Sequence, residues 1–155
     1  MRSRAVMSGY WKRSEETADA LRGGWLHTGD MAYRDGGGYF HIVDRKKDMV
    51  VSGGFNIYPS EIENVLTEDP RVATAAVIGV PDPKWGEAVK AFVTARPGHT
   101  VDVDALIASV KSRKGSHCAP KSIEVVDALP LTAVGKIDKK ALRATYWKGF
   151  ERAVN

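Results

Sequence analysis

Residues 44–63 have the sequence DRKKDMVVSGGFNIYPSEIE, which combines a charge cluster, a strand, a glycine turn and the start of a helix. The cluster 44–48 carries charges of both signs and cannot enter a core unpaired, so it indicates a solvated connector or a polar ligand site. The apolar residues 49–51 favour a strand. Gly53-Gly54 permits positive φ or the close approach of another group. The run therefore suits a mobile part that presents backbone to a ligand.

Periodicity on the C-terminal side of this run predicts the rest of the fold. Ser60 and Glu63 predict a capping box that begins a helix. Residues 72–80 are almost continuously apolar, which indicates a strand buried on both faces. A tight turn connects it to a second strand at 87–95, which favours an antiparallel pair. Three further elements are expected, namely a helix capped by Asp102 or Asp104 and ended by Gly115, a strand at 122–126, and a final helix opened by Asp138 after an extended loop at 129–136.

The predicted fold class is therefore α+β. We expect a small antiparallel or mixed sheet of about three strands packed with helices. A β-hairpin, predicted over residues 25–43 from two strand-like runs around Asp35 and three glycines, precedes this sheet.

Composition excludes several classes of function. The chain has 155 residues and a net charge of +4, which is too small an excess for a nucleic-acid-binding surface. Cys118 is the sole cysteine, so no internal disulfide or cysteine-cluster metal site is expected, and the histidines lack metal-binding spacing. No apolar run is long enough to span a bilayer, and no apolar segment follows Arg2 and Arg4 as in a secretory signal. The expected location is the cytoplasm.

Two candidate functional residues stand out by local chemistry. Asp30 follows Thr28-Gly29, where its carboxylate could accept hydrogen bonds from a sugar diol; a structural turn aspartate is the alternative. Lys136 follows a glycine in a loop before a helix, where its ammonium can reach phosphate or carboxylate; an exposed loop lysine is the alternative. Local spacing leaves both pairs of alternatives open, and the Cys118 thiol is expected to be inert.

Four motifs in order give the chain a family resemblance. They are Gly9-Tyr10-Trp11 with Glu15-Glu16-Thr17, the run WLHTGD at 25–30, the run at 44–63, and PLTAVGKID at 130–138. Together they resemble the C-terminal domain of the adenylate-forming superfamily, which includes acyl-CoA synthetases, peptide-synthetase adenylation domains and firefly luciferase. The form of residues 52–63 is most similar to CoA ligases of fatty and aryl acids.

The resemblance implies a role for four residues in adenylate formation. Asp30 and Arg45 would bind the ribose of ATP. Lys47 falls at the hinge on which the small domain turns. Lys136 would bridge the substrate carboxylate and the α-phosphate, which makes electrostatic sense because a cation stabilises the charge that develops there.

The resemblance also implies a second step in which CoA forms a thioester. After a large rotation, Gly53, Gly54 and Phe55 would replace Lys136 at the active site and line the pantetheine tunnel. From their charge alone, Lys84, Lys114 and Lys121 are further candidates for contacts with the CoA phosphates.

The domain organisation implied by the motifs is a lid with a remnant of a larger body. Residues 1–24 would be a remnant of the large N-terminal domain, 25–46 a hairpin and hinge approach, and 47–155 the lid domain. ATP, Mg²⁺, CoA and a carboxylic acid would serve the whole enzyme, with none bound tightly to this chain. The family's phosphate-binding loop is absent from the sequence, so the chain alone is expected to be inactive.

The alternative is a non-catalytic module that self-associates, for example as a homodimer through the arm around Tyr10 and Trp11.

Overall fold

The apolar run at 72–80 forms a long strand at one edge of the larger sheet in a computed structural model, which describes residues 1–150, and the strand at 86–95 is the central one. Strand β5, Val72–Asp82, pairs antiparallel with β6, Gly86–Ala95, from Val72↔Ala95 to Asp82↔Gly86. The expected antiparallel pair is therefore present, joined by a tight turn at 83–85.

Short strands extend this pair into a mixed sheet. Strands β3, Val50–Ser52, and β4, Phe55–Ile57, form a hairpin, and β3 meets the start of β6 at Ser52↔Gly86. Strand β7, Ser122–Val125, runs parallel to β6. In the part of the chain that the structure describes, this sheet has five strands in place of the three expected, because β3 and β4 join it.

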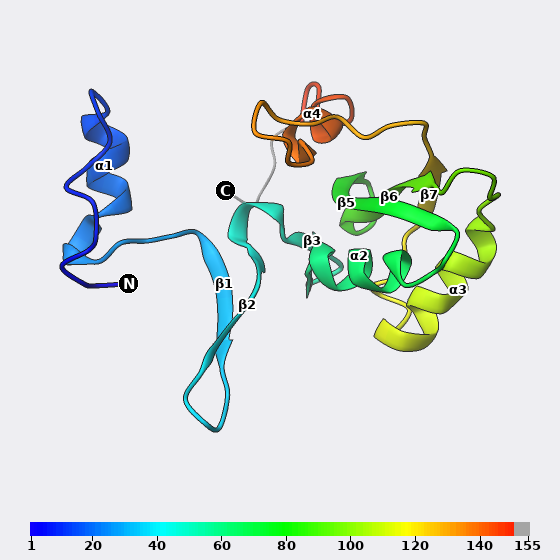
Figure 1. Ribbon diagram of the computed structural model, residues 1–155, viewed down its shortest axis with the longest axis horizontal. Helices are drawn as coiled ribbons and strands as arrows, with labels where there is room; N and C mark the ends of the chain where they lie inside the picture. The colour runs from blue at the N-terminus through cyan, green and yellow to red at the C-terminus, as the bar shows by residue number, and fades with distance from the viewer. Residues whose placement is uncertain (151–155) are drawn as a thin grey trace. The chain divides into compact units, whose positions relative to one another are not determined.

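Helices cover both faces of the sheet, which confirms the α+β class. Helices α2, Pro59–Thr67, and α3, Val103–Lys114, lie on one side, and α4, Lys139–Ala144, lies on the other (Figure 1). Alternate residues of β5 point to the two sides. The set packed with α2 and α3 includes Val72, Ala75 and Val77, and the set packed with the α4 side includes Ala76 and Ile78.

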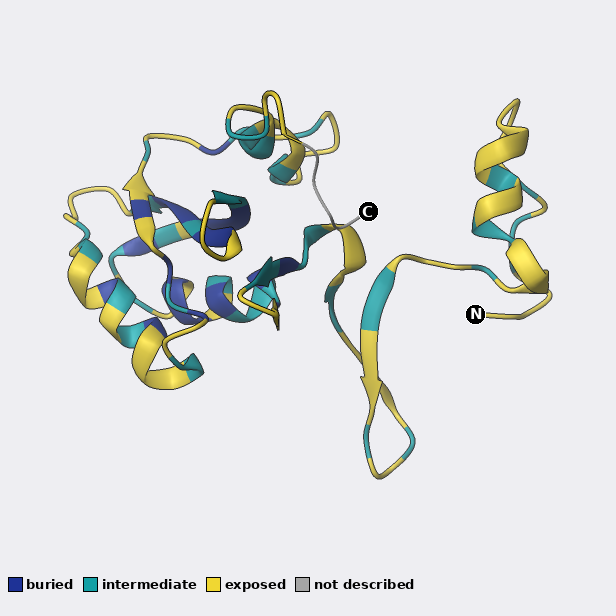
Figure 2. Ribbon diagram, turned by 180° about the vertical axis from the view of Figure 1, so that it is seen from behind, coloured by how far each residue is buried: buried dark blue, intermediate teal, exposed yellow. Residues whose placement is uncertain are grey.

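Burial follows this arrangement. Fully buried residues are concentrated in the sheet and on the inner sides of α2 and α3, whereas the outer sides of the helices are exposed (Figure 2). The nearly continuous apolar pattern of 72–80 is thus explained as expected, because each face of β5 is covered by helices.

The predicted capping box at the start of α2 is wrong. The residue before the helix is Tyr58, and Pro59 occupies the first helical position, where its missing N–H costs nothing. Ser60 Oγ donates to the Val43 carbonyl at 2.6 Å, and Glu63 Oε1 accepts from the Val77 backbone N–H at 2.7 Å. Both side chains therefore hydrogen-bond to neighbouring segments, and neither caps the start of α2.

Helix α3 begins and ends as predicted. Asp102 Oδ1 accepts from Ala105 N at 3.0 Å, which caps the helix. Gly115, at φ +91°, ends it after a last turn rich in basic residues.

The chain divides into two compact units, Met1–Ile42 and the part from Val43 onward. The first contains α1, Ser14–Ala20, and β1, Asp30–Arg34; β2, Phe40–Arg45, forms a two-stranded sheet with β1. The predicted hairpin is present, but its first strand begins at Asp30 and not at residue 25. Within residues 1–150, no helix combines the length and the apolar character needed to cross a membrane.

An ion pair at the end of α2 makes stability depend on pH. Arg71 Nε and Nη2 donate to the Asp69 carboxylate at 2.9 and 2.8 Å, and the Arg71 backbone N–H donates at 2.9 Å. The Arg71 side chain, followed by its backbone N–H, lowers the pKa of Asp69 to about 2. Because the folded pKa lies below the unfolded value near 3.9, this contribution is present above pH 4 and is lost as pH falls toward 2.

We therefore expect Asp69→Asn to destabilise the chain at pH 7 by about 1 kcal/mol. The gap in unfolding free energy between wild type and variant should narrow as pH falls from 5 to 2, measured by urea unfolding at each pH. Asp127→Asn, which removes an exposed carboxylate without an ion-pair partner among the described residues, is the matched control. A gap that does not change with pH would contradict the assignment.

Candidate functional site

The glycine turn between β3 and β4 requires glycine at both positions. Ser52 pairs with Phe55, so Gly53-Gly54 is a two-residue hairpin loop, with φ of +56° and +85°. Two consecutive positive φ values are typical of the hairpin turn that matches strand twist. Gly53 N donates to the Trp85 carbonyl at 2.9 Å, and a Cβ at position 53 would lie 2.7 Å from Trp85 Cε3. The turn therefore lies directly against the loop between β5 and β6.

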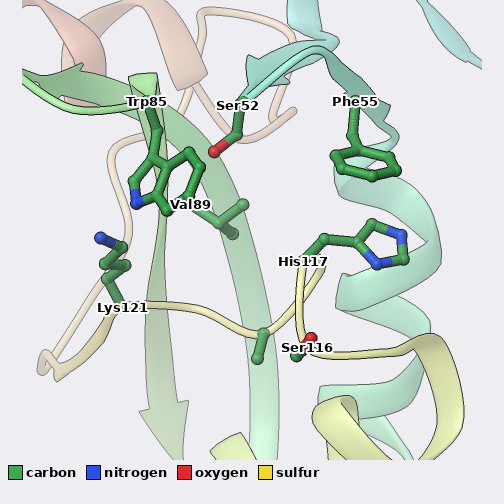
Figure 3. A pocket seen from close by; sticks show the side chains of 9 residues that line it. Ser52, Phe55, Trp85, Val89, Ser116, His117 and Lys121 are labelled. Carbon is green, nitrogen blue, oxygen red and sulfur yellow. The ribbon is translucent and has the colours of Figure 1, made fainter.

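A cavity of about 310 Å³ opens beside this turn. Phe55 and His117 lie on one side, Trp85 and Lys121 on the other, and Val89 lies between them (Figure 3). The rings of Phe55 and His117 stack with centroids 4.8 Å apart. The walls are thus largely apolar, and backbone and polar groups are present at the edges.

Cations gather around the Trp85 side of the cavity. Lys84 Nζ lies 4.6 Å and Lys121 Nζ 5.9 Å from the centroid of the Trp85 ring. Asp82 Oδ1 accepts from the backbone N–H groups of Trp85 and Lys84, each at 2.9 Å, and Lys121 Nζ lies 3.5 Å from Asp82 Oδ2. The Trp85 N–H, with the Lys84 N–H and the Lys121 charge, lowers the pKa of Asp82. The site can therefore hold a flat ring and an anion side by side.

Lys136 lies on a tight hairpin, which corrects the expected extended loop at 129–136. Leu131 pairs with Ile137, Thr132 N donates to the Lys136 carbonyl at 2.7 Å, and Gly135 N donates to the Thr132 carbonyl at 2.9 Å. The Lys136 side chain is exposed, and its ammonium has no hydrogen-bond or ion-pair partner within residues 1–150. A short loop thus presents a single cation to solvent.

The charge cluster at 44–48 is partly built into the fold. Asp44 accepts from Ser60 N at 2.9 Å, so the end of β2 is attached to the start of α2. Lys46–Asp48 forms a 3-10 turn, in which Lys47 is exposed. The cluster is thus an anchored connector and not a freely solvated one.

The structure brings some predicted residues together. Gly53 and Phe55 share one cavity with Lys121. Lys114 does not line this cavity, and it lies 3.5 Å from Glu61 Oε2. Lys136 lies outside the cavity, and Asp30 belongs to the first unit, where its N–H donates to Thr28 Oγ1 at 3.2 Å.

Sequence reasoning missed Trp85 and His117 as candidate site residues. They follow Gly53 in the chain by 32 and 64 positions, and only the pairing of β3 with β6 and the segment after α3 bring them to the turn. The available signal was weak: a tryptophan in a Pro/Gly turn and a histidine after Gly-Ser. The Cys118 thiol is buried, and burial, with the nearby Glu61 charge, raises its pKa, in agreement with an inert thiol.

Comparisons with known proteins identify relatives of most of the chain. Residues 61–136 match the family model of the AMP-binding enzyme C-terminal domain. The medium/long-chain-fatty-acid–CoA ligase FadD8 of Mycobacterium tuberculosis is 52% identical over 96% of this chain and 27% of its own length. A feruloyl-CoA synthase of Amycolatopsis is 53% identical over 91% of this chain and 29% of its own. The chain therefore spans less than a third of these relatives.

Two solved structures of similar sequence share the fold of most of this chain. The amide bond synthetase McbA from Marinactinospora thermotolerans superposes with a TM-score of 0.86 at 43% identity, over 94% of this chain and 30% of that one. The o-succinylbenzoate CoA synthetase MenE from Bacillus subtilis, in complex with its acyl-adenylate intermediate, gives a TM-score of 0.86 at 35% identity, over 91% of this chain and 29% of that one.

Proposed function

Because the chain belongs to the family of AMP-binding enzyme C-terminal domains, we propose that it is the lid domain of an AMP-forming carboxylic acid–CoA ligase. The acid and ATP would form an acyl-adenylate and pyrophosphate, and CoA would then displace AMP to give the acyl-CoA thioester. The observation that carries this proposal is the cavity in which the Gly53 backbone meets an aromatic wall and a cationic rim.

We assign the adenylation step to Lys136, assisted by three residues. The exposed Lys136 ammonium would contact the substrate carboxylate and the α-phosphate and stabilise the charge that develops as pyrophosphate leaves. Asp30 and Arg45 would bind the ribose of ATP. Lys47 would be the hinge residue, and its exposure on a short turn next to the end of β2 supports this role.

We assign the thioester step to the cavity. The pantetheine arm of CoA would pass along the Gly53-Gly54 backbone and the Phe55 ring, where the absence of side chains allows close approach. The nucleotide part would stack on Trp85, and Lys84 and Lys121 would contact its phosphates.

The domain assignment follows from these roles. Residues 1–24 would belong to the large domain, 25–46 would lead to the hinge, and 47–155 would form the lid. The division of the chain at Ile42 and Val43 supports a boundary near the hinge.

Magnesium has no site among the residues that the structure describes. Residues 1–150 contain no group of three or more histidine, cysteine or acidic side chains that could hold a metal ion. We therefore assign no step of the reaction to a metal held by these residues, and Mg²⁺ would accompany ATP elsewhere in the complete enzyme.

The proposal is tested with a chimera that joins this chain to the large domain of a related CoA ligase. The chimera should form acyl-CoA from acid, ATP and CoA, whereas this chain alone should release no pyrophosphate. A chimera that folds but forms neither acyl-adenylate nor acyl-CoA would refute the proposed function.

In the same chimera we expect Trp85→Ala to raise the KM for CoA by about tenfold, because it removes the stacking surface. The KM for ATP should not change. Lys111→Met, which removes an exposed lysine of α3 that does not line the cavity, is the control. An unchanged KM for CoA in Trp85→Ala would exclude this ring from CoA binding.

A second candidate function is self-association without catalysis. It is favoured by the exposed aromatic residues of the N-terminal arm, where Tyr10 is 51% and Trp11 is 86% exposed. Light scattering over a range of concentrations distinguishes the two, because a strict monomer would contradict this candidate and leave the ligase proposal intact.

A further inference from the structure

Two ion pairs attach α4, which lies near the C-terminal end of the domain, to segments near the N-terminal end of the domain. Lys139 Nζ lies 2.7 Å from Glu63 Oε1 on α2, and Arg143 Nη1 lies 2.8 Å from Asp48 Oδ1 in the turn after β2. Lys139 and Arg143 are four residues apart, so they lie on the same face of the helix. None of the residues of α4 itself is fully buried. Leu142 packs against the core cluster that contains Phe92 and Leu129, and the two ion pairs attach this short helix to α2 and to the turn at 46–48.

The pair between Asp48 and Arg143 is unusually sheltered for a surface helix. Each of its side chains is only 13% exposed, whereas the Arg13–Glu16 pair in the first unit is 68% and 51% exposed. Exposed pairs contribute little, but removing one partner of a sheltered pair leaves the other charge desolvated and uncompensated. Asp48 and Arg143 also join segments 95 residues apart in sequence. The pair is thus a long-range constraint on α4.

This ion pair connects the two segments that we propose act in adenylation, the hinge and the hairpin that carries Lys136. Asp48 directly follows Lys47, at the proposed hinge. At the other end, Asp138 Oδ1 caps α4 by accepting from Ala141 N at 3.0 Å, and Asp138 N donates to the Pro130 carbonyl at 2.7 Å, which closes the hairpin that carries Lys136. The turn at 46–48 that contains the proposed hinge residue is therefore connected through the ion pair, α4 and these hydrogen bonds to the hairpin that carries Lys136.

We infer that Asp48 and Arg143 are positioning residues that hold the Lys136 hairpin in a fixed orientation relative to the hinge. The inference rests on the proposed function. With the pair intact, rotation at the hinge carries Lys136 as part of one rigid body. Without it, α4 shifts and the ammonium no longer reaches one defined point. The Gly53-Gly54 turn is held independently by the pairing of β3 with β6 and by the bond from Gly53 N to the Trp85 carbonyl.

The first test uses the chain itself and measures backbone amide hydrogen exchange. In Arg143→Met, the N–H groups of Thr132 and Asp138, which are bonded within the hairpin, should exchange about tenfold faster, and that of Gly53 should not change. Lys140→Met is the matched control, since Lys140 is an exposed lysine of α4 without a partner among the described residues. Unchanged exchange at Thr132 and Asp138 would overturn the inference.

The second test separates the two half-reactions in the chimera. In Arg143→Met, acid-dependent exchange of pyrophosphate into ATP should fall about 100-fold, the loss that a small displacement of a catalytic group can cause. Thioester formation from preformed acyl-adenylate should persist. Arg143→Lys should recover most of the lost exchange, and adding Asp48→Asn to Arg143→Met should cause little further loss.

The outcomes of this second test are distinct. Equal losses in both half-reactions would assign the pair a purely structural role and overturn the inference. A wild-type chimera inactive in both half-reactions would refute the proposed function, and the amide exchange of the chain would still decide whether Asp48 and Arg143 hold the Lys136 hairpin.

Discussion

Replacement of Lys136 by alanine should lower adenylate formation in the chimera by about 100- to 1,000-fold, the typical loss when one preorganised group that stabilises developing charge is removed. The hairpin that presents the ammonium is closed by backbone bonds between Thr132 and Lys136 and between Asp138 and Pro130. These bonds do not involve the Lys136 side chain, so the fold should survive the substitution. Pyrophosphate exchange into ATP, measured with saturating acid, reports this step.

The same variant should still form acyl-CoA from preformed acyl-adenylate. That step is assigned to the cavity beside Gly53, and Lys136 does not line it. Lys140→Ala is the control, since it removes an exposed lysine four residues further along the chain. Lys136→Arg should restore only part of the activity, because a guanidinium keeps the charge but has a different shape and reach. Equal loss of both half-reactions in Lys136→Ala would contradict a role specific to adenylation.

Local patterns in the sequence were sufficient to predict elements whose structure depends on residues close to them in the chain or on a simple pattern of burial. The nearly continuous apolar run at 72–80 predicted a strand covered on both faces, and α2, α3 and α4 provide that cover. Asp102 and Gly115 predicted the ends of α3, because capping depends on neighbours within one turn. The family motifs then gave the class of domain, which the relatives confirm.

The start of α2 shows why other local patterns failed. Ser60 and Glu63 have the spacing of a capping box, but each finds a partner distant in sequence, the Val43 carbonyl and the Val77 N–H. Lys139 also pairs with Glu63. Tertiary contacts that satisfy buried polar groups outweighed the local bond, and no pattern within the helix could indicate them.

The residues that line the cavity could not be predicted from the sequence, again because only tertiary contacts bring them together. Gly53, Trp85 and His117 come from three segments, and each has an ordinary local explanation as a turn or loop residue. Their meeting depends on the register of β3 against β6, in which Ser52 pairs with Gly86. Gly53-Gly54 was identified as a place for close approach, but the ring that approaches it was not.

Substitution of Gly53 by alanine should destabilise the chain by about 2–5 kcal/mol. A positive φ costs an L-residue about 1–2 kcal/mol, and Gly53 has φ +56°. The new Cβ would also lie 2.7 Å from Cε3 of Trp85, and relief of such an overlap typically costs a further 1–3 kcal/mol, about the cost of overpacking. Urea unfolding followed by tryptophan fluorescence measures the loss.

Gly54→Ala is the matched control that separates these two costs. Gly54 has φ +85°, so the variant has a similar backbone cost, but a Cβ added at this position would meet no heavy atom within 4 Å beyond its chain neighbours. It should therefore lose only about 1–2 kcal/mol, and its tryptophan emission should match that of the wild type. Gly53→Ala should shift that emission, because the Trp85 ring must move away from the turn. Equal destabilisation of the two variants would show that the contact with Trp85 does not restrict position 53, and the close approach would then lose its physical basis.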